Sequence, residues 1–164
     1  MDTKRLIRPI QVLLTLGAFE FFGPIVRDTN ASHLLNPAWA GHARFHLMWC
    51  LLLWLSLGTY CLYLIWSQSG DKLKNLYQAF AMQVFNALAF WGAVVLGPTY
   101  SAKVFDANIH VGFMNVNENI LVFLILSLLL VTNLLLLRSL SKQSKERTTT
   151  DSNDKIASLQ EVQS

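Results

Sequence analysis

Four long apolar segments dominate the pattern of hydrophobic and polar positions. They cover about residues 10–26, 47–66, 76–96 and 120–137, and each is about 17 to 21 residues long. A helix needs roughly 20 apolar residues to cross a bilayer, and a chain in lipid must satisfy its backbone hydrogen bonds internally. We therefore predict an all-α fold, a four-helix transmembrane bundle over residues 1–138.

The first apolar segment also resembles a cleaved signal peptide, because basic residues precede it. However, Glu20 lies inside this segment, and no small-x-small cleavage pattern follows it. We interpret it as a retained membrane span.

The segment 139–164 differs sharply from the four spans. It is polar, rich in serine and threonine, and has no sustained apolar period. Such a segment cannot bury enough apolar surface to offset the entropy of folding. We predict a disordered cytoplasmic tail.

Composition supports an integral, multi-pass membrane protein with the lipid bilayer as its first partner. The chain is 53% hydrophobic and 14% charged, against about a quarter charged in soluble proteins. We expect it in the plasma membrane or, in a bacterium, the inner membrane. Its basic pI of 9.0 has a simple origin, because lysine and arginine gather on one side of the spans. Those residues are Lys4, Arg5, Arg8, Lys72, Lys74, Arg138, Lys142, Lys145 and Arg147.

The positive-inside rule makes that basic side cytoplasmic, together with both termini. Only Arg27, Arg44 and Lys103 flank the other side. The positive charge thus orients the chain in the membrane and indicates no nucleic-acid partner.

This orientation places every histidine on the non-cytoplasmic side. The four are His33, His42, His46 and His110. Asp28 and Glu118 fall on the same side, and Glu20 would lie only about 9 Å below Val26 along a helix. We therefore predict a polar centre of histidines and carboxylates in the outer half of the bundle.

The stretch "HLLNPAWAGHARFH", residues 33–46, carries three of these histidines. Asn36 and Pro37 favour a turn or a helix start, and we expect the membrane helix to begin there, with Trp39 at the interface. His42, His46 and Cys50 would then form a row on one helix face. Imidazole and thiol are ligands for copper or zinc, so these three are candidate metal ligands, for a transition metal or haem.

Structural roles for the same residues stay open. A histidine pair near an interface often bonds loop carbonyls or faces water, and a zinc site usually needs three or four protein ligands. Glu20 is a candidate proton carrier, acid/base residue or metal ligand; the alternative is a buried carboxyl bonded to Arg27 or Arg44. Gln83 and Asn86 share a face of the third span, where polar contacts between helices are expected.

Several classes of function have no support in the sequence. Cys50 and Cys61 are about 16 Å apart along one helix and cannot bridge each other. The chain has no Cys-x-x-Cys pair, phosphate-binding glycine loop, His-Glu-x-x-His helix or Gly-x-Ser-x-Gly elbow. Thiol relays, phosphoryl transfer and serine hydrolysis are therefore not indicated.

A resemblance covers about nineteen residues from Asp28, "DTNASHLLNPAWAGHARFH". This stretch resembles a family of small four-span membrane proteins of fungi and bacteria. Their shared pattern is Asp, Asn, Ser/Thr-His, Asn-Pro-x-Trp and His-Ala-Arg/Lys-Phe-His. The chain departs from fungal members at Thr29, where they tend to have tryptophan, and at Ala40-Gly41, where they tend to have two prolines. The resemblance implies a four-span fold and a shared site at the motif, and it brings no activity with it.

A looser similarity, of architecture only, links the chain to the emopamil-binding and sterol-isomerase superfamily. Those membrane proteins carry histidines and carboxylates between their helices and move a proton across a lipid double bond without metal. No motif of that superfamily occurs here, so this similarity is an analogy.

We hypothesise an enzyme that acts on a lipophilic small molecule at the non-cytoplasmic side, by metal or haem redox chemistry or by acid/base isomerisation. The candidate catalytic residues are Glu20, His33, His42, His46 and His110. The candidate substrate-binding residues are Asp28, Asn36, Trp39, Arg44 and Glu118, with Arg44 suited to an anionic head group. The alternative is a non-catalytic membrane subunit or a lipid-binding module. Asn30-Ala31-Ser32 also matches the N-glycosylation pattern. The sequence does not indicate an oligomeric state.

Overall fold

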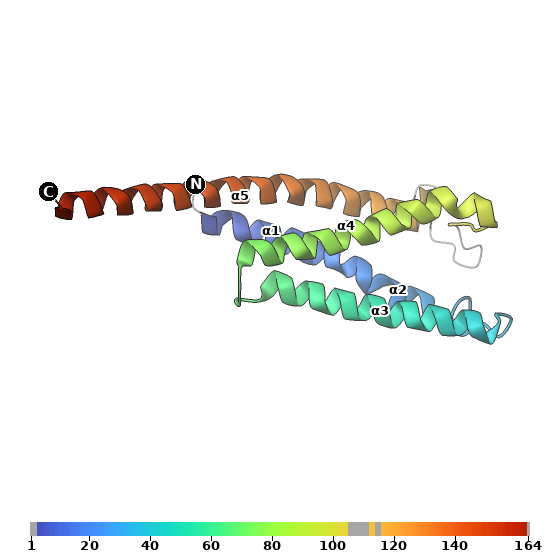
Figure 1. Cartoon of the computed structure of the whole chain (residues 1–164). Coiled ribbons are helices and arrows are strands. Elements are labelled where there is room, and N and C mark those ends of the chain that lie inside the picture. Colours follow the sequence, from blue (N-terminus) through green and yellow to red (C-terminus); the bar gives the residue numbers. More distant parts are fainter. Residues whose placement is uncertain (1–2, 105–111, 114–115, 164) are drawn as a thin grey trace.

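The described part of the chain is a bundle of long helices that run alternately up and down (Figure 1). The structure is a computed structural model that describes residues 3–104, 112–113 and 116–163, with side chains described for 6–104 and 117–150. Four helical stretches are long and apolar enough to cross a membrane: Leu6–Asp28, Gly41–Trp66, Lys72–Tyr100 and Glu118–Thr150. The predicted four-span bundle is therefore confirmed, and the chain is an integral, multi-pass membrane protein.

The first span is interrupted rather than continuous. It consists of α1 (Thr3–Ala18), the short 3₁₀ helix η1 (Phe19–Phe21) and α2 (Gly23–Asp28). Pro24 lacks the N–H that would bond the carbonyl of Glu20 in a regular α-helix. One turn earlier, the N–H of Phe22 bonds the carbonyl of Phe19, three residues back, at 3.1 Å. Glu20 therefore sits at a break in the helix.

The remaining elements follow in up-and-down order. Helix α3 (Gly41–Trp66) returns to the first end, and α4 (Lys72–Leu96) leads out again and continues in the 3₁₀ helix η2 (Gly97–Tyr100). Two short antiparallel strands, β1 (Gly112–Phe113) and β2 (Val116–Asn117), precede α5. Helices α4 and α5 begin within four residues of the predicted starts at 76 and 120, whereas α1 begins at Thr3 and α3 at Gly41, well before the predicted starts at 10 and 47.

Helix α5 (Glu118–Gln163) is much longer than its span. The side chain of Asn117 accepts hydrogen bonds from the N–H groups of Asn119 (2.9 Å) and Ile120 (3.3 Å), as expected of a helix cap. The far end of α5 projects beyond the other helices (Figure 1). Its backbone is helical where the sequence predicts disorder. A lone polar helix has only its own backbone hydrogen bonds to hold it, so disorder of this tail in solution stays a prediction.

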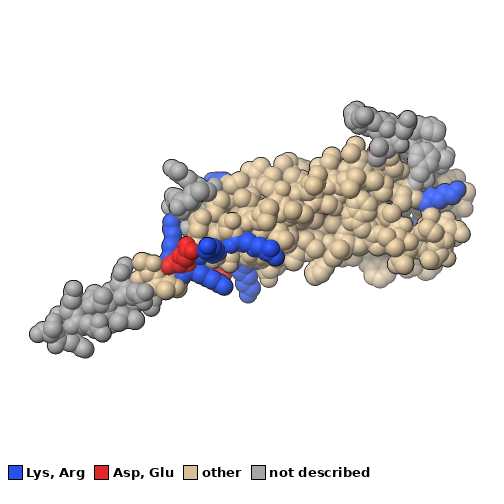
Figure 2. Space-filling model, turned by 90° about the horizontal axis from the view of Figure 1, so that it is seen from above, with Lys and Arg blue, Asp and Glu red and all other residues tan. Residues whose placement is uncertain are grey.

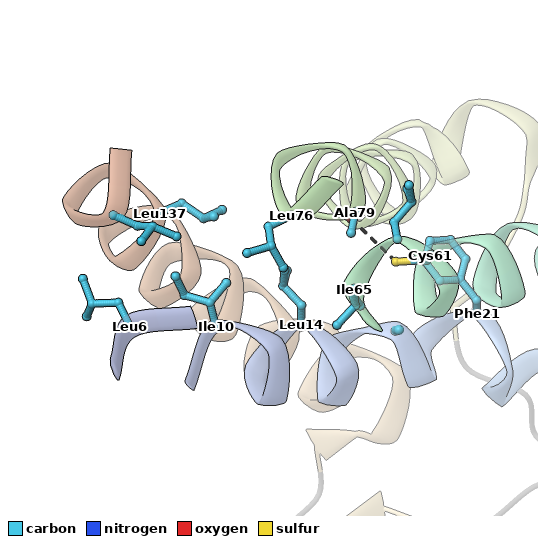
Figure 3. Packing of buried hydrophobic residues seen from close by; sticks show 12 residues of the cluster. Leu6, Ile10, Leu14, Phe21, Cys61, Ile65, Leu76, Ala79 and Leu137 are labelled. Atoms are coloured by element: carbon cyan, nitrogen blue, oxygen red, sulfur yellow. Dashed lines mark hydrogen bonds between the residues drawn. The ribbon is translucent and has the colours of Figure 1, made fainter. Parts of the chain in front are cut away.

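The core lies on one row of α1. Leu6, Ile10, Leu14 and Ala18 recur every four residues, on one helix face, and each is at most 6% exposed. Helix α1 packs against α3, α4 and α5. Figure 3 shows this row meeting side chains of all three helices. The partners are Cys61, Leu64 and Ile65 of α3, Leu76 and Ala79 of α4, and Leu137 and Leu140 of α5.

Polar contacts join the helices inside this core. Gln11 donates a hydrogen bond to the carbonyl of Ile65 at 2.7 Å, and Gln83 donates to the carbonyl of Leu14 at 2.8 Å. The predicted interhelical role of Gln83 is thereby confirmed. A Cβ atom at Gly58 would lie 2.8 Å from the Cβ of Phe21, so this glycine lets α3 and η1 approach closely.

The charge pattern matches the predicted orientation. Figure 2 shows lysine and arginine mainly at one end, separated by a wide uncharged band from a single basic patch near the other. Both termini lie at the basic end (Figure 1), which is the cytoplasmic end by the positive-inside rule.

Candidate functional site

The loop between α2 and α3 is organised by Asn30. Its side-chain oxygen accepts hydrogen bonds from the N–H of Ser32 (2.8 Å), the hydroxyl of Ser32 (2.8 Å) and the N–H of His33 (3.1 Å). Its amide nitrogen donates to the carbonyl of Arg27. Asn30 therefore shapes the loop through its own side chain, a role that asparagine commonly takes in turns. Glycosylation at this residue stays a prediction.

The same loop positions His33. The hydroxyl of Ser32 lies 2.7 Å from Nδ1 of His33, and the rings of His33 and Trp39 meet edge to face with centroids 5.8 Å apart. Both rings are half-buried. His33 and Trp39, predicted for different roles, are thus neighbours in one folded loop.

The predicted helix start at Asn36 and Pro37 is wrong. Helix α3 begins at Gly41, and its N-cap, Ala40, offers no side-chain hydrogen bond. Asn36 instead accepts a hydrogen bond from the N–H of Ala38 at 2.9 Å and closes a turn. An asparagine before proline satisfies a turn as well as a helix cap, so the local pattern alone did not distinguish them.

His42 and His46 form a direct pair in the first turns of α3. Their Nε2 atoms are 2.9 Å apart, and their ring centroids are 4.4 Å apart. Both side chains are exposed. Since residues four apart face the same way on a helix, this contact follows from the spacing that the sequence shows.

Aromatic side chains surround the pair. Trp49 stacks against His46 with centroids 6.0 Å apart, and the ring of Phe45 lies 5.9 Å from that of His46. Phe45 is 63% exposed and Trp49 is 60% exposed. Helix α3 is about 39 Å long at 1.5 Å per residue, longer than the roughly 30 Å hydrocarbon layer. A helix of this length can extend beyond the hydrocarbon layer.

The predicted metal ligands His42, His46 and Cys50 lie in order along the first turns of α3. His42 and His46 are placed as two neighbouring nitrogen ligands, and Cys50, which is exposed, follows one turn later. Within the described residues, no three histidine, cysteine or acidic side chains converge as a metal-ligand group. His110 lies outside the described residues. A metal role for His42, His46 and Cys50 stays a prediction.

The predicted carboxylates lie apart from the pair. Glu118, at the start of α5, forms an ion pair with Arg27 at the end of α2. Asp28 ends α2, and its carbonyl accepts a hydrogen bond from the N–H of Leu34 at 3.0 Å. The ion pair joins the outer ends of α2 and α5, and the hydrogen bond of Asp28 joins α2 to the following loop.

Arg44 is half-buried on the second turn of α3. Its Nε atom is buried and has no hydrogen-bond partner among the described residues. Binding of an anionic head group by Arg44 stays a prediction.

Glu20 also lies away from the histidine pair. It is 8% exposed and close to Cys61 of α3 and Asn86 of α4. The adjacent Phe21 packs at the level of Gly58, about 18 Å along α3 from His46 at 1.5 Å per residue. Glu20 and the histidine pair, expected in one polar centre, thus lie at different depths of the bundle.

Asn133, like Gln11, is a buried polar residue that the sequence pattern did not single out. It lies in the apolar run of α5, is 0% exposed, and neither of its amide atoms has a hydrogen-bond partner among the described residues. A single amide among leucines was the signal that could have identified it.

Comparisons with protein-family models, with curated proteins and with solved structures find no match. The resemblance of the loop motif to the four-span family of fungi and bacteria therefore stays a prediction, and the geometry of the site carries the functional argument.

Proposed function

We propose that the protein is a membrane-embedded enzyme that acts on a lipophilic molecule at the non-cytoplasmic surface, with His42 and His46 as its proton donor and acceptor. The observation that carries this proposal is the 2.9 Å contact between their Nε2 atoms. It lies in the first turns of α3, where a lipid-soluble molecule and water both have access.

The contact suits proton transfer for a simple reason. A neutral imidazole has one N–H and one acceptor nitrogen, so a hydrogen bond between two Nε2 atoms requires a proton on one ring and a lone pair on the other. A single added proton would give one imidazolium and one neutral ring, whereas two added protons would place two positive charges side by side. The pair therefore offers one proton donor and one proton acceptor at adjacent positions.

The surroundings favour an apolar substrate. Phe45 and Trp49 border the pair with exposed rings, and tryptophan rings prefer the membrane interface. The proposed reaction is an isomerisation in which one carbon of the substrate gains a proton and another loses one. It needs no oxidant or reductant.

Deuterium incorporation tests this reaction directly. The purified protein is incubated in D₂O with a total lipid extract, and the lipids are then analysed by mass spectrometry. We expect one lipid class to gain deuterium at carbon with the wild type and not with His42→Ala/His46→Ala. Ser56→Ala, an exposed change on the same helix, should behave as the wild type. Absence of any deuterated lipid with the folded wild type would refute the proposal.

A metal-dependent form of the site uses the same two nitrogens. Two Nε2 atoms at this separation could also bind one transition-metal ion or take part in haem ligation, with a third ligand from elsewhere. Elemental analysis and a visible spectrum of the wild type and of His42→Ala/His46→Ala decide this point. Near-stoichiometric metal or a haem band that the variant lacks would support it.

The alternative function, a non-catalytic membrane subunit or lipid-binding module, is favoured by one observation. Glu118 is paired with Arg27, and Glu20 is buried about 18 Å along α3 from His46, so neither of these two carboxylates orients an imidazole of the pair. Under this alternative, His42→Ala/His46→Ala would change association with a partner or lipid and produce no change in deuterium labelling.

A further inference from the structure

Glu20 is a buried acid inside the membrane. Its side chain is 8% exposed, and neither carboxyl oxygen has a hydrogen-bond partner among the described residues. A polar group without partners in lipid costs several kcal/mol. The protonation state of Glu20 therefore needs an explanation of its own, separate from the histidine pair.

The elements packed around Glu20 offer it no described cation. Helix α3 contributes the thiol of Cys61, and α4 contributes the neutral amides of Gln83 and Asn86. On α2, Arg27 is paired with Glu118. Asp28, at the end of the same helix, is a further acid on this element.

Asn86 is the one polar group suited to bond the acid. Gln83 already donates to the carbonyl of Leu14 at 2.8 Å and to the sulfur of Cys61 at 3.5 Å. The side chain of Asn86 lies beside Glu20, although not in the geometry of an ordinary hydrogen bond. A small rotation of either side chain would let a protonated carboxyl donate to the amide oxygen of Asn86.

We propose that Glu20 is a proton-binding site in the membrane interior: it holds a proton in the closed packing of η1, α3 and α4, with the amide oxygen of Asn86 as acceptor for its O–H. The proton is the ligand, and the break at η1 is the place where the packing can loosen to release it. This inference is independent of the proposed enzyme activity, because it concerns a different depth of the bundle and different residues.

Infrared difference spectroscopy on the full chain in lipid tests the proton directly. In the spectrum of the wild type minus Glu20→Gln at neutral pH, we expect a carboxylic-acid C=O band that shifts in D₂O. Glu118→Gln is the matched control, because it removes an ion-paired acid at the membrane surface and should leave this band in place. Loss of an ionised-carboxylate signal in Glu20→Gln, with no acid band, would overturn the proposal.

A second variant leaves Glu20 itself unchanged and protects the test against misfolding of Glu20→Gln. Asn86→Leu removes the acceptor, so the acid band of the wild type should move to higher frequency. An unchanged band position would overturn the role given to Asn86. A carboxylate band that changes when sodium replaces potassium would show a bound metal cation instead of a proton and would overturn the proposal as a whole.

Discussion

The two halves of α3 differ in how closely they pack against the other helices. In the cytoplasmic half, Cys61, Leu64 and Ile65 are at most 3% exposed and contact α1 and α4 (Figure 3). In the outer half, Phe45, Trp49 and their neighbours are mostly exposed. The packed half holds the fold together, whereas the open half presents the histidine pair to lipid and water. Changes in the first should therefore affect stability, and changes in the second should affect activity.

Gly58→Leu should have the largest effect on stability, because Gly58 lies where the packed half meets η1. A Cβ here already comes within 2.8 Å of the Cβ of Phe21, so a leucine forces the helices apart. We expect a loss of about 3 kcal/mol, at the upper end for overpacking. Unfolding by denaturing detergent, followed by circular dichroism, measures it. Gly41→Leu is the control, since nothing lies within 4 Å of a Cβ at Gly41; equal losses in both variants would contradict the prediction.

Leu64→Ala and Leu52→Ala compare the two halves with the same chemical change. Leu64 is 3% exposed and Leu52 is 54% exposed. Lipid tails are as apolar as leucine, so the loss of stability comes mainly from the cavity that alanine leaves. We expect a loss of about 2 kcal/mol for Leu64→Ala. Leu52→Ala should stay within about 0.5 kcal/mol of the wild type. Similar losses for the two leucines would show that the outer half is also covered by protein.

Gln83→Leu should produce an intermediate effect. It removes the hydrogen bond to the carbonyl of Leu14, and polar contacts between membrane helices contribute on average about 0.6 kcal/mol. Gln78→Leu, an exposed change on the same helix, is the control in the same unfolding measurement. A gain in stability for Gln83→Leu would show that the amide is retained for specificity and does not stabilise the bundle.

Arg27→Gln and Glu118→Gln probe the outer connection between α2 and α5. Their ion pair is largely exposed, so a double-mutant cycle should give a coupling of about 0.2–1 kcal/mol. The coupling should shrink at high salt, because solvent-exposed charges are screened. A coupling that salt leaves unchanged would mean that lipid or protein covers this pair.

His42→Ala/His46→Ala should have the smallest effect on stability and the largest on activity. Both side chains are exposed, and such surface changes usually stay within about 0.5 kcal/mol. Deuterium labelling of lipid should nevertheless disappear. A folded variant that still labels lipid fully would show that the two histidines are not needed for the reaction. A strongly destabilised variant would show that they have a structural role.

The sequence by itself determined the four spans and the shared helix face of His42 and His46, and it predicts the orientation of the spans in the membrane. Each of these depends on local or cumulative properties: apolar length, the side on which lysine and arginine lie, and the four-residue spacing of a helix face. The cap at Asn117 was predictable for the same reason, because its partners are the next few residues.

Only the tertiary structure decided which distant groups meet. The pairing of Glu118 with Arg27, and the separation of Glu20 from the histidines, depend on how deeply each helix is set against its neighbours. That depth follows from close contacts such as Gly58 against Phe21, which no single segment encodes. The physical reason is that side-chain periodicity fixes a residue's face on its own helix, whereas packing between helices fixes its height and its partner.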